Sequence, residues 1–255
     1  MELGLRDKAV LVTGASRGIG RRTALAFGAE GARVAITYHS DREAAEAVAK
    51  EIDRAYVVRM DLNDPESIAT AVAEAEDHWQ GLDVLVGNAV NWGSGDFHNR
   101  PTRIEDAQPA EWEPVLRANL EGNFRLVQAA APALRRSEQG RLVLVSTDLA
   151  ERGMTGSWAY GAAKAGLHGL IANLAHDLGQ DGVLANIVMP GVTLEDGEHR
   201  VIPSAALAEF TKKFTAQRLP DADDVAAAIV FLCSARTTAT MGEILRVNGG
   251  VLNAA

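Results

Sequence analysis

The chain has very little cysteine, since Cys233 is the only one among its 255 residues. No intramolecular disulfide can form, and no cluster of thiolates can hold a metal ion. Cys233 ends the apolar run Ile229–Cys233, which predicts a buried and inert thiol. The six histidines show no metal-binding spacing, because the pair on the same predicted helix, His168 and His176, lies eight residues apart. We therefore expect no metal site.

Long hydrophobic runs and an excess of positive charge are also missing. No stretch approaches the length of a membrane span, and the first residues carry charges where a signal peptide needs an apolar segment. We expect a cytoplasmic protein with no membrane partner. The formal net charge of -9 repels nucleic acid and anionic lipid, so no nucleic-acid partner is expected either.

The chain is instead rich in short apolar runs of strand length, separated by longer amphipathic stretches. Continuous Val/Ile/Leu runs predict parallel strands that helices cover on both faces. No linker interrupts the alternation, so residues 1–255 are predicted to form a single doubly wound α/β domain. The predicted strands include residues 9–12, 34–36, 56–58, 84–86, 142–145, 186–188 and 244–247. The predicted helices are Arg21–Glu30, Arg42–Ile52, Pro65–Trp79, Ala110–Arg136, Trp158–Leu178 and Asp223–Cys233.

Two long segments depart from this alternation, Asn91–Pro109 and Thr193–Leu219. The second contains a predicted short helix at Ser204–Phe214. Both follow predicted strands, on the edge where open α/β sheets bind their ligands. Loops of this length in a compact domain are usually functional, so we predict that these two form the substrate site.

The first predicted strand runs into Thr13–Gly20, a glycine-rich turn directly before a helix. Gly14 suits a sharp turn off the strand, Gly18 lets the backbone approach a pyrophosphate, and Gly20 lets the helix pack on the sheet. Glycine spacing alone is a weak signal. The strand–turn–helix context makes a dinucleotide site the favoured interpretation.

The end of the second predicted strand indicates which dinucleotide is bound. NAD-preferring proteins carry a carboxylate there for the ribose 2′-hydroxyl, whereas this chain reads Tyr38-His39-Ser40. Arg17 in the glycine turn is suited to pair with a 2′-phosphate, helped by Ser40 and Arg42. The alternative is that Arg17 only points to solvent. We predict NADP(H) as the cofactor.

Asp61 closes the third predicted strand, where its carboxylate can accept a hydrogen bond from an adenine amino group. Alternatively, it belongs to the start signal of the next helix, in which Asn63-Asp64-Pro65-Glu66 is a good cap by itself. The two interpretations are compatible.

Tyr160 and Lys164 open a predicted helix four residues apart, so the phenol and the ammonium share one face. A nearby cation favours the phenolate and is expected to lower the pKa of Tyr160, which makes the phenol a usable proton donor and acceptor. The Tyr-x-x-x-Lys pattern is common alone, but it is specific when coupled to the upstream glycine turn. A hydrolase is disfavoured, because the Gly-x-Ser-x-Gly nucleophile motif is absent.

With these motifs the whole chain resembles the short-chain dehydrogenase/reductase family in its single-domain, ketoreductase-like form. That family has a seven-stranded parallel Rossmann sheet with three helices on each face. The resemblance rests on Thr13–Gly20, Asp61, Asn88-Ala89, Asn119, Tyr160 with Lys164, Pro190-Gly191 and Asn248-Gly249-Gly250.

The resemblance implies a role for each matching residue. Tyr160 would be the general acid/base, Lys164 would bind the nicotinamide ribose and depress the Tyr160 pKa, and Asn119 would anchor a proton-relaying water. With Thr147 these form the predicted catalytic set. The predicted cofactor contacts are Gly14, Ser16, Arg17, Gly18, Ile19, Gly20, Tyr38, His39, Ser40, Asp61, Leu62, Asn88, Ala89, Val90, Tyr160, Lys164, Pro190, Gly191 and Thr193.

Three positions depart from the family pattern. The family has serine thirteen residues before the catalytic tyrosine, where this chain has Thr147. We assign that role to Thr147 rather than to the adjacent Ser146, which should point to the other side of the strand end. Val90 replaces a glycine beside the cofactor, so its loop must sit differently. Glu195 replaces the usual threonine five residues after Pro190, although Thr193 is close by.

The predicted substrate pocket is aromatic, which suggests a flat or aliphatic substrate held by apolar contacts. Its members are Trp92, Phe97, Met154, Trp158, Phe210 and Phe214. Each of them could instead anchor a loop. Relatives that reduce acyl-carrier-protein thioesters have basic residues beside the active-site entrance, and the aligned residues here are Glu138 and Asp181, with Arg135 and Arg136 near. An acidic carrier would be repelled, which favours a free small molecule.

The predicted catalytic helix carries small residues at positions 162, 165, 166, 169 and 172, a stripe that lets another helix approach closely. In the family this face pairs across a two-fold axis, so we expect a homo-oligomer, a tetramer or a dimer. The alternative is that the stripe packs only on its own sheet.

The predicted function is NADP(H)-dependent hydride transfer between nicotinamide and a carbonyl or alcohol carbon of a small substrate. The favoured form is a ketone reductase of 3-oxoacyl or secondary-metabolite type. Two alternatives remain: a non-catalytic NADP-binding regulator or scaffold of the same fold, and a dehydratase or epimerase variant.

Overall fold

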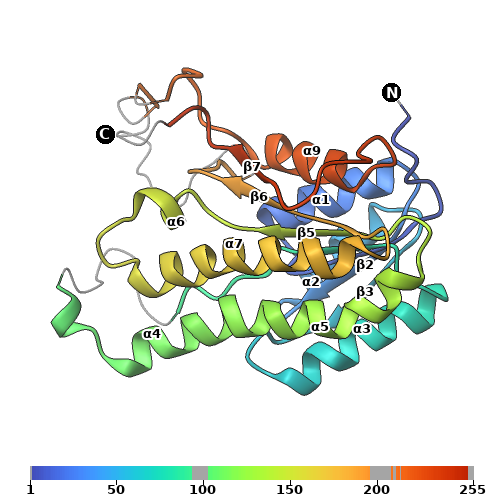
Figure 1. Ribbon diagram of the computed structural model, residues 1–255, viewed down its shortest axis with the longest axis horizontal. Coiled ribbons are helices and arrows are strands. Elements are labelled where there is room, and N and C mark those ends of the chain that lie inside the picture. The colour runs from blue at the N-terminus through green and yellow to red at the C-terminus, as the bar shows by residue number, and fades with distance from the viewer. Residues whose placement is uncertain (1, 94–102, 196–207, 209–210, 213, 252–255) are drawn as a thin grey trace.

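A seven-stranded parallel sheet forms the centre of the molecule (Figure 1). The computed structural model describes residues 2–93, 103–195, 208, 211–212 and 214–251. The strand order is β3-β2-β1-β4-β5-β6-β7. Strands β2 and β3 are added on one side of β1 and strands β4 to β7 on the other, which confirms the predicted doubly wound class. The strands are β1 (Ala9–Val12), β2 (Arg33–Tyr38), β3 (Ala55–Arg59), β4 (Val84–Gly87), β5 (Arg141–Val145), β6 (Leu184–Pro190) and β7 (Ile244–Val247).

The central strands are buried on both faces, as their apolar runs predict. Every residue of β1, β4, β5 and β6 is buried. Successive side chains of a strand point to opposite faces, so a strand with no exposed face needs an unbroken apolar run rather than an alternating one. The edge strand β7 is less covered, with Leu245 38% exposed.

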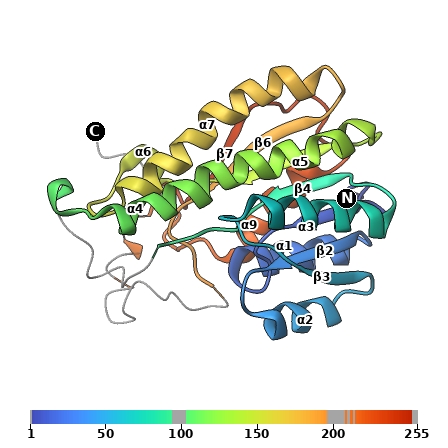
Figure 2. The same ribbon diagram turned by 90° about the horizontal axis from the view of Figure 1, so that it is seen from below.

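Helices cover the two faces of the sheet in two groups, which lie on either side of the strands in Figure 1, and Figure 2 looks onto one of these groups from below. One hydrophobic core joins the sheet to α1 (Gly18–Ala29), α2 (Arg42–Lys50) and α9 (Ala222–Cys233). The other joins it to α3 (Pro65–Trp79), α5 (Asn123–Arg136) and α7 (Trp158–Gly179). Each fully buried large side chain, such as Phe27 of α1, contributes about 1.5–3 kcal/mol by leaving water.

The predicted elements differ from the structure mainly at their ends. Helix α1 begins at Gly18 rather than at Arg21, because the Arg21 amide already donates to the Arg17 carbonyl at 3.1 Å and so closes the first helical turn. The predicted helix Ala110–Arg136 is three consecutive pieces: α4 (Pro109–Leu116), a π-helical segment η3 (Arg117–Gly122) and α5. A 3-10 turn η2 (Ile104–Asp106) precedes α4.

Two further outcomes concern short helices. Helix α6 (Leu149–Arg152) was not predicted, because four residues are too few to show a helical period. The predicted helix Ser204–Phe214 lies largely outside the described residues. Among the described helices, none combines the length and the apolar character that crossing a membrane requires.

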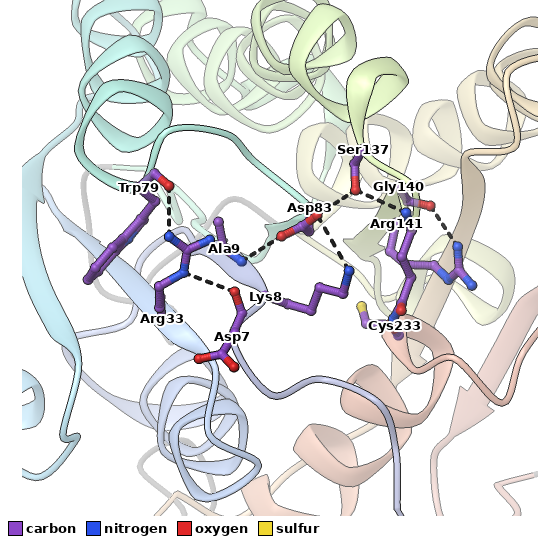
Figure 3. Close-up of polar contacts among 11 residues, drawn as sticks. Asp7, Lys8, Ala9, Arg33, Trp79, Asp83, Ser137, Gly140, Arg141 and Cys233 are labelled. Carbon is purple, nitrogen blue, oxygen red and sulfur yellow. Dashed lines mark hydrogen bonds and ion pairs between the residues drawn. The ribbon is translucent and has the colours of Figure 1, made fainter.

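A polar network closes the amino edge of the sheet (Figure 3). The carboxylate of Asp83 accepts hydrogen bonds from the Ala9 amide at 2.8 Å and from the Ser137 hydroxyl at 2.5 Å. The Arg141 guanidinium is buried beside Cys233 and donates to the Thr237 carbonyl at 3.0 Å. Cys233 is buried, as predicted, and burial raises the pKa of its thiol, which disfavours the reactive thiolate. The opposite, carboxyl edge carries the predicted site residues.

Candidate active site

The predicted site residues meet at the carboxyl edge of the sheet. The glycine turn follows β1, Asn88 follows β4, Thr147 lies just after β5, and Pro190 ends β6. Because the strands are parallel, these chain segments end on the same side of the molecule. Lys164 of α7 joins them by donating to the carbonyl of Val145, the last residue of β5.

The glycine turn is shaped as its three glycines predict. Gly14 and Gly18 have left-handed φ values of 63° and 54°, which other residues rarely adopt. A Cβ at Gly20 would lie 2.4 Å from the Gly14 carbonyl oxygen and 2.5 Å from Asn88 Nδ2. Gly20 therefore packs against the turn itself and against Asn88, more than against the sheet. The half-buried Ser16 and Ile19 complete the turn.

Asn88 and Thr13 hold the ends of β1 and β4 together. The Asn88 side chain donates to the Thr13 carbonyl at 2.9 Å and to the Gly14 carbonyl at 3.2 Å. The Thr13 hydroxyl accepts from the Asn88 amide at 2.9 Å and from the Ala89 amide at 3.0 Å, and it donates to Val86. Thr13 was not assigned a function of its own from sequence, although it opens the motif.

The predicted nucleotide-selective residues lie together at the ends of β2 and β3. His39 Nε2 is 3.3 Å from Asp61 Oδ2, so a histidine faces the predicted adenine-binding carboxylate. Asp64, not Asp61, caps α3, because its carboxylate accepts from Glu66 and Ser67. The predicted contact Leu62 is buried beneath Gly122. A Cβ added at Gly122 would lie 2.5 Å from the Leu62 carbonyl oxygen.

The cationic side chains near this end differ in their partners. Arg17 is exposed at the start of α1, next to the glycine turn. Arg42 donates to Glu46 at 2.7 Å and lies near the Tyr38 phenol, so it faces its own helix and the end of β2. Ser40 is exposed between them along the chain.

The predicted catalytic residues form a buried cluster. Tyr160 is 5% exposed, Thr147 7% and Lys164 1%, and Thr147 lies close enough to the Tyr160 phenol to influence its pKa. The Lys164 ammonium lies 5.9 Å from the centre of the Tyr160 ring and donates to the Val145 carbonyl at 2.7 Å. Ser146 faces α7 instead, 2.8 Å from His168 Nε2, so Thr147 is the hydroxyl that meets the phenol.

The predicted lowering of the Tyr160 pKa is wrong for this structure. Burial of the phenol raises the pKa of Tyr160, and the Asp148 carboxylate raises it further, while the nearby Thr147 side chain opposes both. Burial also lowers the pKa of Lys164 to about 8, which weakens the cationic effect that the sequence pattern implied. Desolvation is a tertiary effect that spacing along a helix does not reveal.

The π-helical segment η3 places Asn119 beneath the loop that follows β4. The fully buried Asn119 side chain donates to the Asn91 carbonyl at 2.6 Å and accepts from the Asn91 amide at 3.2 Å. This two-way contact fixes the backbone before Trp92, whose ring lies 4.3 Å from the Tyr160 ring, centre to centre, at 36°. The neighbouring Val90 is 38% exposed.

The segment after β6 approaches both halves of the site. The Pro190 carbonyl accepts from the Asp148 amide at 2.9 Å, and Thr193 donates to the Gly191 carbonyl at 3.0 Å. Glu195 reaches the glycine turn, since a Cβ at Gly18 would lie 2.8 Å from its carboxylate oxygen Oε1. An acidic side chain therefore lies where the sequence predicts a pyrophosphate contact.

The predicted aromatic pocket is only partly assembled. Trp92 contacts Tyr160, while Met154 is 37% exposed and the half-buried Trp158 opens α7. Phe214 is 2% exposed and packs near Gly249, which favours the loop-anchoring interpretation for this residue. Phe97 and Phe210 lie outside the described residues.

The inference from Glu138 and Asp181 is wrong in its geometry. Both residues precede their strands, β5 and β6, and so lie at the amino edge of the sheet, away from Tyr160. Asp181 is paired there with Arg135. Glu138 and Asp181 therefore do not flank the active-site entrance within this chain. Within the described ranges, no group of three or more potential ligands could hold a metal ion.

Comparison with known proteins identifies the family. Residues 14–252 match the family described as Enoyl-(Acyl carrier protein) reductase. The chain belongs to the short-chain dehydrogenase/reductase family. The predicted resemblance is thereby confirmed, as is the prediction of an oxidoreductase enzyme.

Relatives within this family match over nearly their whole length. The 3-oxoacyl-[acyl-carrier-protein] reductase FabG of Aquifex aeolicus is 34% identical, covering 98% of this chain and 100% of the relative. The protein of the same name from Staphylococcus aureus is 32% identical, covering 96% and 98%. A short chain dehydrogenase from Burkholderia cenocepacia, solved in complex with NADP, is 34% identical with a TM-score of 0.87, covering 98% and 99%.

Sequence reasoning missed several residues of this dehydrogenase/reductase site. Asn91 gave no signal, because its role is a backbone contact with Asn119. The contact between Trp92 and Tyr160 joins residues far apart in the chain. The buried Asp148 follows Thr147 directly, and a carboxylate in an otherwise apolar and hydroxyl-bearing stretch was the signal that could have revealed it.

Proposed function

We propose that residues 1–255 form one catalytic domain that uses NADPH to reduce the carbonyl group of a small ketone, with Tyr160 as the proton donor. One observation carries this proposal: Tyr160, Thr147 and Lys164 are buried together on the same sheet edge as the glycine turn. A phenol and a hydroxyl that converge on one point can together hold a carbonyl oxygen.

The residues at the nucleotide end fit NADP(H). The bare backbone at Gly14 and Gly18 leaves room for a pyrophosphate at the start of α1, where backbone N–H groups and the helix dipole favour an anion. Arg17, Ser40 and His39 would hold a 2′-phosphate, and the end of β2 has no carboxylate to repel it. Glu195 is the exception, since its carboxylate lies against Gly18.

The cofactor, when bound, supplies a hydride to the carbonyl carbon of the substrate. Tyr160 gives its phenolic proton to the oxygen, and the Thr147 hydroxyl donates a hydrogen bond to the same oxygen. The methyl group of Thr147 narrows the poses that the substrate can adopt. Lys164 would bind the nicotinamide ribose and return a proton toward the phenol, with Asn119 holding the relay in place.

The substrate class follows from the residues around the phenol. The Trp92 ring contacts the Tyr160 ring and the exposed Met154 flanks the start of α7, so a flat or aliphatic ketone fits best. The FabG relatives reduce 3-oxoacyl groups by name. A β-ketoester or a related 3-oxo compound is the substrate that we propose.

The decisive experiment follows NADPH consumption with a panel of ketones, β-ketoesters and quinones. We expect turnover with at least one of them, and a loss of about 10²–10⁴-fold in Tyr160→Phe, which keeps the ring but removes the proton. NADPH binding should be retained in the variant. If the protein binds NADPH and turns over none of the panel, the non-catalytic alternative is favoured instead.

We also propose a cytoplasmic homo-oligomer, a tetramer or a dimer. The single cysteine is buried, as suits a reducing compartment. On α7, Ala162, Gly169 and Ala172 are exposed, while Gly166 packs on Leu120 of the same chain. Part of the small-residue stripe thus belongs to the chain's own packing, and part is open to a second copy. Cell fractionation and light scattering test the location and the assembly.

A further inference from the structure

Trp92 covers the catalytic phenol with one part of its ring and leaves the rest of the ring open. The ring centres of Trp92 and Tyr160 lie 4.3 Å apart, and the ring planes are tilted by 36°. Tyr160 is 5% exposed, whereas Trp92 is 48% exposed. A large apolar surface is therefore open directly beside the group that would protonate the substrate.

The backbone on both sides of Trp92 is anchored. The Asn119 side chain donates to the Asn91 carbonyl at 2.6 Å and accepts from the Asn91 amide at 3.2 Å. The Asn91 side chain in turn accepts from the Gly93 amide at 2.8 Å. Gly93 has a φ of 84°, and a Cβ added there would lie 2.9 Å from Val115 Cγ2, so the backbone packs closely on α4. Because its neighbours are fixed, the Trp92 ring loses little further freedom when a ligand binds to it.

The surface that a substrate meets beside the phenol is that of Trp92. Tyr160 packs with Val115 of α4 and Leu149 of α6 in one apolar cluster, and these two side chains are 5% and 9% exposed. A tyrosine hydroxyl lies at the rim of its own ring. A ketone oxygen that accepts the phenolic proton therefore brings the adjoining group of the substrate next to the rings that border the phenol. Of these three neighbours, Trp92 is the one with open surface.

Building on the proposed function, we propose that Trp92 is a specificity-determining residue that favours ketones whose carbonyl carbon carries a flat aromatic ring. Aromatic pairs gain from offset or edge-to-face contact in addition to the area that they bury. A saturated ring of the same size buries a similar area on the indole but gains no such contact. Among β-ketoesters, the preferred substrate then has an aryl group on its 3-oxo carbon.

A matched pair of substrates tests this inference. Ethyl benzoylacetate and ethyl 3-cyclohexyl-3-oxopropanoate have the same number of carbon atoms and differ in whether the ring is flat. The measured quantity is the ratio of kcat/KM for the aryl substrate to kcat/KM for the cyclohexyl substrate. Comparing this ratio between proteins cancels the intrinsic reactivity of the two ketones and any equal effect of a substitution on Tyr160.

Trp92→Leu should lower the ratio about 3- to 10-fold, because the aromatic contact is lost while an apolar side chain remains. The change should appear in the KM of the aryl substrate, since the contact is made in the ground state and the transition state alike. Trp92→Phe keeps a flat ring and should retain most of the wild-type ratio. If Trp92→Leu does not fold, Trp92→Met takes its place as the variant without an aromatic ring.

Phe231→Leu is the matched control. Phe231 is a 45% exposed aromatic residue on α9, which packs on the face of the sheet opposite to α7. Its loss should leave the ratio unchanged. If Trp92→Leu reduces kcat/KM for both substrates equally, Trp92 only supports the phenol and the proposal is overturned. A ratio that rises in Trp92→Leu overturns it as well.

A binding measurement separates this inference from the proposed function. The two corresponding 3-hydroxy esters are titrated by calorimetry into the protein with NADPH, a combination in which no hydride can be transferred. The ratio of their dissociation constants should change in Trp92→Leu by the same factor as the kinetic ratio. If no ketone is reduced but this binding ratio changes, only the proposed function fails. If reduction occurs and neither ratio changes, only the role of Trp92 fails.

Discussion

At the scale of single residues, the site places two titratable groups where water is scarce. Tyr160 and Lys164 are both almost completely buried, and Lys164 has one carbonyl partner, that of Val145. Burial disfavours the charged form of each group, so a cost in stability accompanies the catalytic arrangement. Active sites commonly keep such groups at the expense of stability.

Lys164→Met should therefore stabilise the fold while abolishing activity. The pKa of Lys164 is lowered from 10.5 to about 8 in the folded chain, so at neutral pH the ammonium is held against its burial cost. We expect the free energy of unfolding to rise by about 1–3 kcal/mol near neutral pH, reduced by the contribution of the lost hydrogen bond to Val145. Urea unfolding with NADPH absent measures it.

The same substitution has a defined pH dependence. Between about pH 8 and 10.5 the unfolded wild type binds more protons at Lys164 than the folded chain does, so wild-type stability from this residue rises with pH. The advantage of Lys164→Met should shrink across that window. The exposed Lys50 at the end of α2 provides the control, since Lys50→Met should show no such trend. If Lys164→Met is less stable than the wild type at every pH, the burial cost assigned to the Lys164 ammonium is wrong.

Sequence predicted the members of this cluster but not their electrostatics. The spacing of Tyr160 and Lys164 fixes which side chains share a helix face, and the period of a strand indicates that Thr147 rather than Ser146 meets the phenol. The direction of the Tyr160 pKa depends on how deeply the ring is buried and on Asp148 across the turn. Both depend on packing between distant segments, which a pattern of neighbours in sequence does not contain.

At the scale of elements, the strands and long helices follow from the sequence, and the loops between them do not. The short apolar runs of Val, Ile and Leu predict buried strands. Helix α6 and the π-helical segment η3 depend instead on contacts made after the sheet has formed. The segment after β6 is the clearest case. The sequence shows that this segment departs from the family pattern at Glu195. It does not show that the Glu195 carboxylate contacts Gly18.

Glu195→Gln should tighten NADPH binding. The carboxylate lies against Gly18 at the start of α1, where the cofactor would bring a pyrophosphate, and like charges at this distance repel. We expect a fall in the NADPH dissociation constant of about tenfold, or about 1.4 kcal/mol. Fluorescence titration of NADPH measures it directly.

Two controls isolate the pyrophosphate. Adenosine 2′-monophosphate, which lacks that group, should bind the wild type and Glu195→Gln equally. Glu138→Gln makes the same change in net charge at the amino edge of the sheet and should leave NADPH affinity unaltered. An equal gain for both ligands would show a general charge effect in place of the local one.

At the scale of the whole molecule, two cores on either side of one sheet hold the carboxyl edge rigid while the amino edge is sealed by polar contacts. This division predicts which surfaces are free for assembly. Helix α7 carries the catalytic Tyr160 and Lys164 on its inner face, and Gly169 on its outer face has no described atom within 4 Å of a Cβ built on it. Oligomer contacts there would brace the catalytic helix from outside.

Gly169→Arg should reduce the size of the assembly. A long charged side chain on this face keeps a second helix from approaching closely, while the open space allows the single chain to accept it. Light scattering should show a smaller particle than the wild type, with NADPH binding preserved. Thr70→Arg on the exposed side of α3 is the matched control and should leave the size unchanged. An unaltered particle in Gly169→Arg would place the interface elsewhere.

The wide turn at Arg117–Gly122 makes this stretch intolerant of changes in length. Helical residues advance by about 100° each, so removing one residue would rotate everything beyond it and carry Asn119 away from the Asn91 backbone. The loop bearing Trp92 would then lose its tether. Insertions and deletions should accordingly be rejected within the six residues of the π-helical segment.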